Sequence, residues 1–316
     1  MEKYIYLDQN IIQYIYDGHI SLKKNDDFCY VYSDEHFNEI NRSEDERFFN
    51  TLRQLETRKI NVKLDSGFNI IDEAIVLKYE DPKILYDDYI ERMHDKKKYF
   101  DSFMKIQPYL LGNKEAINPK EIKEGFFNYQ MELLNETTEV QMPTEFLSLY
   151  KEIMKQLSEN FANTLTKLKD KILPIEQLRK KITPVNLSEL KFDDNTKKID
   201  QIWETIKKKN PELKKEQFFD EKPLFDSHIT EEPLFLTIAK FHCSLNILGY
   251  FPDKGLTKTS KIYGINSDAV HLANAIYCSG IISADDHLCK KAIVIYEYFD
   301  IQTKVIQVKF IEKKEA

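Results

Sequence analysis

Four acidic residues occupy positions at which carboxylates could meet and bind a metal ion. Asp8 ends the apolar run Tyr-Ile-Tyr-Leu-Asp, and Asp285 follows the apolar segment Ile281–Ser283 by two residues. Asp268 begins the segment Asp-Ala-Val-His-Leu-Ala, and Glu39 lies on an expected helix near the start of the chain. Carboxylates that converge repel one another unless a cation lies between them. These residue types therefore predict a divalent-metal site.

Two predicted strands place two of these acids at one edge of a sheet. Apolar, aromatic and β-branched residues predict strands at Lys3–Leu7, Phe28–Tyr32, Ile281–Ser283 and Thr303–Val308, with helices between them. Strands that alternate with helices predict a parallel sheet covered on both faces. Ligand sites in such sheets lie at the carboxyl ends of the strands, where Asp8 and Asp285 follow theirs.

The middle of the chain has a helical pattern. Apolar residues between Pro143 and Pro174 recur at steps of three and four, which predicts one long amphipathic helix, and Thr196–Lys209 predicts another. We therefore expect an α/β domain formed by residues 1–80 and 240–316, interrupted by a large all-α insertion at residues 81–239.

The composition excludes some classes of protein and leaves others open. The 316 residues carry 46 basic and 53 acidic side chains, which is not the strongly basic balance of a nucleic-acid coat protein. A nuclease remains compatible, because its acidic site contributes negative charge. Lysine-rich runs at residues 96–98, 179–181 and 207–209 form either solvated helix faces or a basic rim for RNA phosphates.

The cysteines and the apolar runs indicate a cytoplasmic protein without a membrane span. None of the four cysteines forms a C-x-x-C pair, so reduced thiols are expected and a zinc knuckle is not. The first residues do not form a signal peptide, since the apolar run is short and ends in an acid. No run approaches the roughly 18 apolar residues of a membrane span.

Four short motifs resemble those of PIN-domain nucleases. The family has an Asp at the end of its first strand, a Ser and a Glu on its second motif, an Asp opening a later helix, and a Thr or Ser two residues before a final Asp. The similar segments here are Tyr6–Asn10, Ser33–Ile40, Asp268–Ala275 and Ile282–Leu288. The resemblance covers about residues 1–50 and 260–310, and the helical middle has no counterpart in it.

The resemblance implies a PIN-like parallel sheet flanked by helices and a metal-dependent phosphodiesterase that uses Mg²⁺ or Mn²⁺. Asp8, Asp268 and Asp285 would bind the metal, and Glu39 would orient the attacking water or bind a second ion. The supporting residues would be Asn10 and Ser283, which hydrogen-bond the carboxylates, and His271, which contacts phosphate or tunes Asp268.

Cleavage of RNA is the commonest activity of the family, so we expect a metal-dependent endoribonuclease that serves as a bacterial toxin or an anti-phage defence effector. Two alternatives stay open, namely a structure-selective DNA nuclease and a catalytically silent PIN-like scaffold for a protein partner. The helical insertion is the expected binding region for such a partner or for an inhibitor, and the sequence leaves oligomerisation open.

Each site residue also has a purely structural interpretation. Asp8 could cap the following helix, and Asp268 suits the start of a helix over Ser267–Cys278 that Ser267 or Asn266 would cap. The remaining alternatives are a surface position for Glu39 with Glu35 as its competitor, Asp286 as ligand in place of Asp285, and a buried, hydrogen-bonded role for His271.

Overall fold

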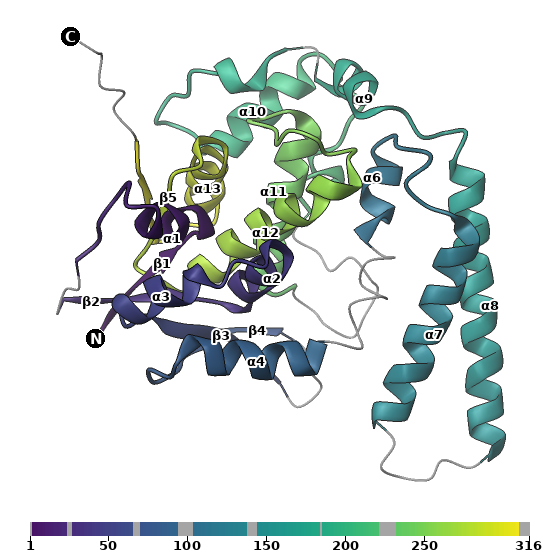
Figure 1. The fold of residues 1–316 in the computed structure, drawn as a ribbon. Helices are drawn as coiled ribbons and strands as arrows, with labels where there is room; N and C mark the ends of the chain where they lie inside the picture. Colours follow the sequence, from purple (N-terminus) through teal and green to yellow (C-terminus); the bar gives the residue numbers. More distant parts are fainter. Residues whose placement is uncertain are drawn as a thin grey trace. The chain divides into compact units, whose positions relative to one another are not determined.

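The computed structural model describes residues 2–23, 27–65, 70–93, 104–137, 144–183, 185–220 and 232–309 (Figure 1). The chain divides into two compact units. Unit 1 comprises Met1–Tyr89, Arg179–Asp253 and Gly264–Ala316, and unit 2 comprises Ile90–Leu178 and Lys254–Tyr263.

Unit 1 contains a six-stranded sheet with the order β4-β3-β2-β1-β5-β6. The strands are β1 (Lys3–Leu7), β2 (Phe28–Tyr32), β3 (Arg58–Leu64), β4 (Ile70–Val76), β5 (Gly280–Ser283) and β6 (Lys304–Gln307). All neighbouring strands are parallel except β3 and β4, which are antiparallel. The expected α/β class with a mostly parallel sheet is confirmed.

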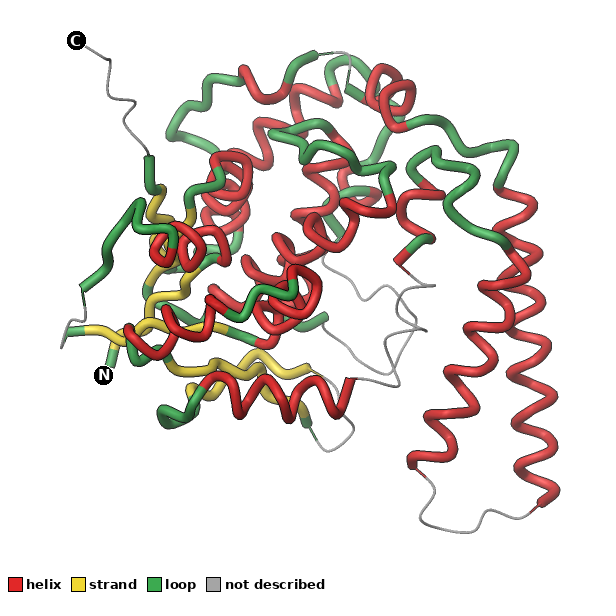
Figure 2. The backbone as a smooth tube through the Cα atoms, in the orientation of Figure 1, coloured by secondary structure: helices red, strands yellow, loops and turns green. Residues whose placement is uncertain are grey.

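The helices of unit 1 connect and cover these strands, as Figure 2 shows in red. They are α1 (Gln9–Tyr16), α2 (Asp34–Ser43), α3 (Arg47–Gln54), α10 (Lys198–Lys207), α11 (Leu234–Leu248) and α13 (Asp286–Tyr298), with short turns η1 (Leu187–Glu189) and η2 (Lys215–Gln217). Three helices run across a boundary between the units, namely α4 (Pro82–Met93), α9 (Ile175–Ile182) and α12 (Thr259–Ala275).

The register of β1 places alternate side chains on opposite faces of the sheet. Tyr6 pairs with Val31 on one side and with Ile281 on the other, and all three belong to one hydrophobic core. Leu7, the next residue, points to the opposite face because side chains alternate along a strand. Both Tyr6 and Leu7 are fully buried, so β1 is the central strand of the unit.

The division into units differs from the expected boundary at residues 81–239. Ile199, Ile202, Trp203 and Ile206 form the apolar face of α10 and are buried in the same core as the strands. Helix α11 adds Ile238 and further apolar residues to that core. Because these faces need the sheet to be buried, residues 179–239 belong to unit 1 and not to a separate insertion.

Helix α12 begins eight residues earlier than expected, at Thr259 and not at Ser267. Ile262 and Ile265 are buried and extend the apolar face that continues at Ala269 and Leu272. The expectation of a helix start at Ser267 was therefore wrong. Asp268 lies inside the helix, where its carboxylate does not meet free backbone N–H groups as it would at an N-terminus.

The hairpin of β3 and β4 was not predicted from the sequence. Charged residues interrupt the apolar alternation of β3, and one of them, Lys59, is buried and pairs with Asp34 at 2.6 Å. The ion pair compensates for the burial of the ammonium. The sequence alone does not show this pair, because it forms only when β3 lies beside α2.

Unit 2 is helical. It contains α6 (Ile106–Leu110), α7 (Pro119–Thr137) and α8 (Thr144–Leu168), and a small core forms around Tyr109, Ile122 and Leu165. Figure 1 shows α7 and α8 side by side. They are antiparallel, since Lys123 pairs with Glu159 near one end of the pair and Tyr150 with Gln130 nearer the other. The expected long helix is thus present as α8.

Within the described ranges, no helix combines the length and the apolar character that a membrane crossing requires. The four cysteines are all free thiols. The lysine run at 96–98 lies outside the described residues, whereas Lys180, Lys181 and the run at 207–209 are exposed on unit 1.

Replacement of Ile206 by Ala should lower the free energy of unfolding of unit 1 by about 2–5 kcal/mol, because the fully buried side chain leaves a cavity in the core. Urea unfolding followed by the fluorescence of Trp203, the single tryptophan, measures this change. The matched control is Ile153→Ala in α8, where the side chain is 42% exposed. An equal loss in both variants would show that α10 is not part of the core.

Candidate functional site

The site is built around the carboxyl ends of β1 and β5. Leu7 pairs with Ile282, and the backbone N–H of Asp8 donates to the Ile282 carbonyl at 3.0 Å. Strand β2 lies on one side of β1 and β5 on the other. The connections that follow β1 and β5 therefore leave in opposite directions, and open α/β sheets bind ligands at the carboxyl ends of such strands.

Asp8 is held by hydrogen bonds to one of its two carboxylate oxygens. Its side chain is buried, and Oδ2 accepts from Ser283 Oγ and from Asn10 Nδ2, each at 2.5 Å. Asn10 Oδ1 in turn accepts from the backbone N–H of Ala284 at 3.0 Å. No side-chain bond caps α1, and Oδ1 accepts none from the described residues. Asp8 is thus not a helix cap, and Oδ1 can bind another partner.

Ser283 connects Asp8 with Asp285. Its hydroxyl oxygen accepts from the backbone N–H of Asp285 at 3.0 Å while it donates to Asp8. Asp285 Oδ1 accepts from the Leu288 N–H at 2.8 Å, so this residue caps α13 and keeps Oδ2 available. Its competitor Asp286 accepts from Gln307 at 2.9 Å, and both acids are exposed. Asp285 is therefore the acid tied to the strand ends.

Asp268 shares an electrostatic environment with these acids. Burial raises the pKa of Asp268 well above its ordinary value, and the charges of Asp253, Asp8 and Asp285 raise it further, whereas Lys291 lowers it. Burial also raises the pKa of Asp8, against the charge of His271 and the hydrogen bond from Ser283. Such carboxyl groups ionise readily only when a cation is close.

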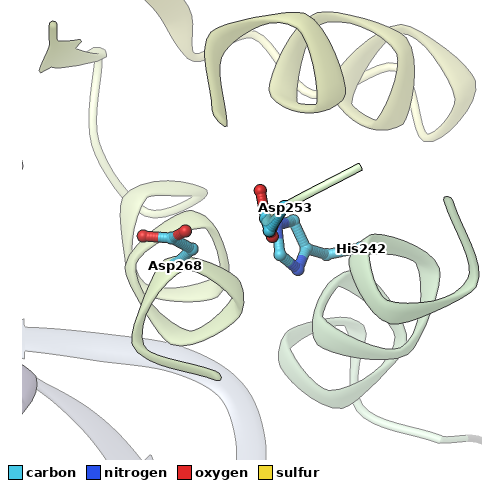
Figure 3. A group of neighbouring side chains, drawn as sticks. All are labelled: His242, Asp253 and Asp268. Carbon is cyan, nitrogen blue, oxygen red and sulfur yellow. The ribbon is translucent and has the colours of Figure 1, made fainter. Parts of the chain in front are cut away.

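The donor set suits a hard cation, but its atoms are not arranged around one point. Asp8, Asp268 and Asp285 offer only carboxylate oxygens, the ligands that Mg²⁺ and Mn²⁺ prefer. Within the described ranges, the group of three acids, histidines or cysteines whose ligand atoms all lie within 4.8 Å of one another is His242, Asp253 and Asp268 (Figure 3). Asp8, Asp268 and Asp285 would need to turn toward one another to share an ion.

Glu39 forms an ion pair with His271 beside Asp8. The Glu39 carboxylate lies 3.1 Å from His271 Nε2, and His271 Nδ1 bonds the Tyr6 hydroxyl at 2.8 Å, which bonds Ser33 Oγ at 2.7 Å. Burial alone would lower the pKa of His271, but the charges of Glu39 and Asp8 raise it to about 9. His271 lowers the pKa of Glu39 despite burial. Neither residue is a surface residue.

Two neighbours have structural roles. His36 is buried, accepts from the Ser33 N–H at 3.1 Å and bonds the Leu7 carbonyl at 2.7 Å. Burial and the charge of His271 lower the pKa of His36 to about 3, so the neutral ring donates from Nε2 and fixes the end of β1. Glu35 accepts a hydrogen bond from Ser267 and lies 3.8 Å from Arg42.

Three residues of this region were missed by the analysis of the sequence. Asp253 follows the turn Gly-Tyr-Phe-Pro and has no strand before it. His242 lies on the apolar helix α11, and Lys291 lies on α13. From the sequence, a lysine at such a position is expected to be a surface residue. Only the proline before Asp253, which marks a loop, gave any local signal.

Comparisons of the chain with protein-family models, with curated proteins and with solved structures give no match. The arguments about function therefore depend on the residues and their geometry.

The metal-free protein should lose stability between about pH 6.5 and 9 because of His271. Its pKa is raised from 6.5 to about 9 in the fold, so the contribution is complete below 6.5 and is lost as the pH rises through 9. The shift bounds the effect at about 3 kcal/mol.

Urea unfolding in the presence of a chelator, at steps of pH, measures this slope. His271→Gln should remove it, because the amide does not titrate. His36→Gln should keep it, since His36 is already neutral above pH 6.5 in both states. A wild-type slope that survives in His271→Gln would contradict the assignment.

Proposed function

We propose that this protein is a metal-dependent endoribonuclease of PIN-like type that hydrolyses RNA phosphodiester bonds with Mg²⁺ or Mn²⁺. The observation that carries the proposal is the placement of Asp8 and Asp285 at the ends of two neighbouring parallel strands, bonded to the same Ser283 hydroxyl. The resemblance of four segments to PIN-domain motifs supports the same activity.

In this proposal Asp8 and Asp285 bind the ion directly, with Asp268 as a third ligand. A bound divalent ion lowers the pKa of its water and neutralises charge on the phosphate. Ser283 and Asn10 orient Asp8 by donating to Oδ2, so that Oδ1 is the oxygen directed to the ion. Their role is to fix the carboxylate rotamer before the ion arrives.

Glu39 and His271 serve the substrate in this scheme. Because Glu39 is paired with a protonated His271, it is not a free base in the resting protein. Because His271 is fully buried, its role in this scheme is to hold Glu39 in place beside Asp8. The exposed lysines at 180–181 and 207–209 could neutralise further phosphates of the RNA.

The proposed biological role, a toxin or an anti-phage effector, depends on the family resemblance alone. A catalytically silent scaffold is the second candidate, and one observation favours it. Asp8, Asp268 and Asp285 do not form the ligand group that their joint binding of one ion requires. Cleavage assays separate the two candidates.

Asp8→Asn and Asp285→Asn should each reduce cleavage of a labelled RNA in Mn²⁺ by about 100- to 1000-fold, since each removes several kcal/mol of charge stabilisation. The initial rate on single-stranded RNA, with DNA of the same sequence in parallel, gives the measurement. Asp87→Asn on α4, an exposed acid outside the site, is the matched control. Equal rates for wild type and Asp8→Asn would reject the nuclease.

Ser283→Ala should weaken activation by Mn²⁺ about 10- to 100-fold, because Asp8 loses the hydroxyl that orients it. Ser283→Thr retains a hydroxyl and should restore activation. The measurement is the Mn²⁺ concentration at half-maximal cleavage. An alanine variant that needs no more Mn²⁺ than wild type would show that Ser283 does not act through Asp8.

A further inference from the structure

His242 is a buried histidine that makes no hydrogen bond to a described residue. It lies on α11 with no exposed surface, and neither Nδ1 nor Nε2 bonds any described residue. A buried imidazole that makes no hydrogen bond loses its interactions with water and gains nothing in return. Native interiors rarely leave such a group unsatisfied unless a ligand completes it.

Two carboxylates lie beside this ring. Nε2 is 3.8 Å from Asp253 Oδ2, and one ligand atom each of His242, Asp253 and Asp268 lies within 4.8 Å of the others. Figure 3 shows them approaching from α11, from the loop after it and from α12. No hydrogen bond from the described residues reaches the Asp268 carboxylate. An imidazole nitrogen and a carboxylate are thus both available at one point.

The loop that carries Asp253 is fixed in advance. Asn246 accepts from the Asp253 N–H at 2.9 Å and donates to Oδ2 at 2.8 Å, and His287 bonds the carbonyl of Pro252 at 3.1 Å. Lys291, itself fully buried, donates to both Asp253 oxygens at 2.7 Å. These contacts hold the carboxylate in place as the outer partners of metal ligands do.

The charges leave room for a cation. Lys291 balances Asp253, but no described residue forms an ion pair with Asp268, and the charges of Asp8 and Asp285 also reach it.

We propose that His242, Asp253 and Asp268 bind a divalent first-row transition-metal ion. One imidazole nitrogen with two carboxylates favours Mn²⁺, Co²⁺ or Zn²⁺ over Mg²⁺ and Ca²⁺, which bind nitrogen poorly. This site does not depend on the proposed nuclease activity, since a protein that cuts nothing could hold the ion. Asp268 is the residue that it shares with the acids at the strand ends.

Pulsed electron paramagnetic resonance of Mn²⁺ bound to the full chain tests the site, because it detects an imidazole nitrogen on the ion. Wild type should show this coupling. His242→Leu should lose this nitrogen coupling. Its affinity for Mn²⁺ should also fall by more than the roughly 10- to 100-fold expected when only a supporting residue is removed. His242→Gln should behave alike and serves if the leucine variant does not fold.

Two controls separate this proposal from the proposed function. Asp8→Asn removes the strand-end acid and should retain the nitrogen coupling, whether or not it abolishes cleavage. His19→Gln replaces an exposed histidine of unit 1 and should also retain it. Absence of nitrogen coupling in wild type, or its persistence in the His242 variants, would overturn the proposal and leave the nuclease assay unaffected.

The same variants predict a thermal shift that needs no activity. Mn²⁺ or Zn²⁺ should raise the melting temperature of wild type more than that of His242→Leu, because an ion that binds only the folded state stabilises it and the variant retains only the strand-end acids. Mg²⁺ at the same concentration should have a smaller effect on wild type. Equal shifts by Mn²⁺ in wild type and His242→Leu would contradict the site.

Discussion

The concentration of carboxylates around the ends of β1 and β5 is the constraint on which the rest of the site depends. Some acids of the region have a basic partner, as Glu39 has His271 and Asp253 has Lys291. Asp8 and Asp268 form no ion pair with a described residue, and burial raises the pKa of both. A nearby cation would keep two such acids ionised.

The fold brings these groups together through strand order. Adjacent β1 and β5 come from opposite ends of the chain, and their parallel pairing places Asp8 beside Ser283. One hydroxyl then connects both strand ends, because Ser283 donates to Asp8 and accepts from Asp285. Helix α10, which was expected in an insertion, and helix α11 contribute to the same core as Tyr6. The middle of the chain therefore supports the site as well as separating its two halves.

The sequence predicts strands and site residues correctly where its local pattern agrees with the tertiary structure. The apolar runs before Asp8 and Asp285 marked the strands, and parallel pairing put both acids at one edge. Asp268 was identified from a wrong premise, since Ser267 resembles a helix cap, yet Ile262 and Ile265 extend the helix backwards. A cap motif is a local signal, and the burial of an apolar face outweighs it.

The residues that were missed depend on contacts that no local pattern records. Lys291 is buried only because Asp253, 38 positions away, accepts both of its hydrogen bonds.

His242 on an apolar helix looks like an ordinary core residue until both of its nitrogens prove to be unpaired. Predictions from hydrophobic periodicity assume that polar residues lie at the surface. Polar residues that are buried by long-range partners do not follow this assumption.

Asp268 belongs to both proposed metal sites. It lies within ligand reach of His242 and Asp253, and it also feels the charges of Asp8 and Asp285. A cation on either side would hold Asp268 ionised and so prepare it for a second cation, while the two cations would repel each other directly. A carboxylate between two ions reduces that repulsion, which is the arrangement found where paired metals act on phosphates. Because the two proposed sites share Asp268, their affinities for ions would be interdependent.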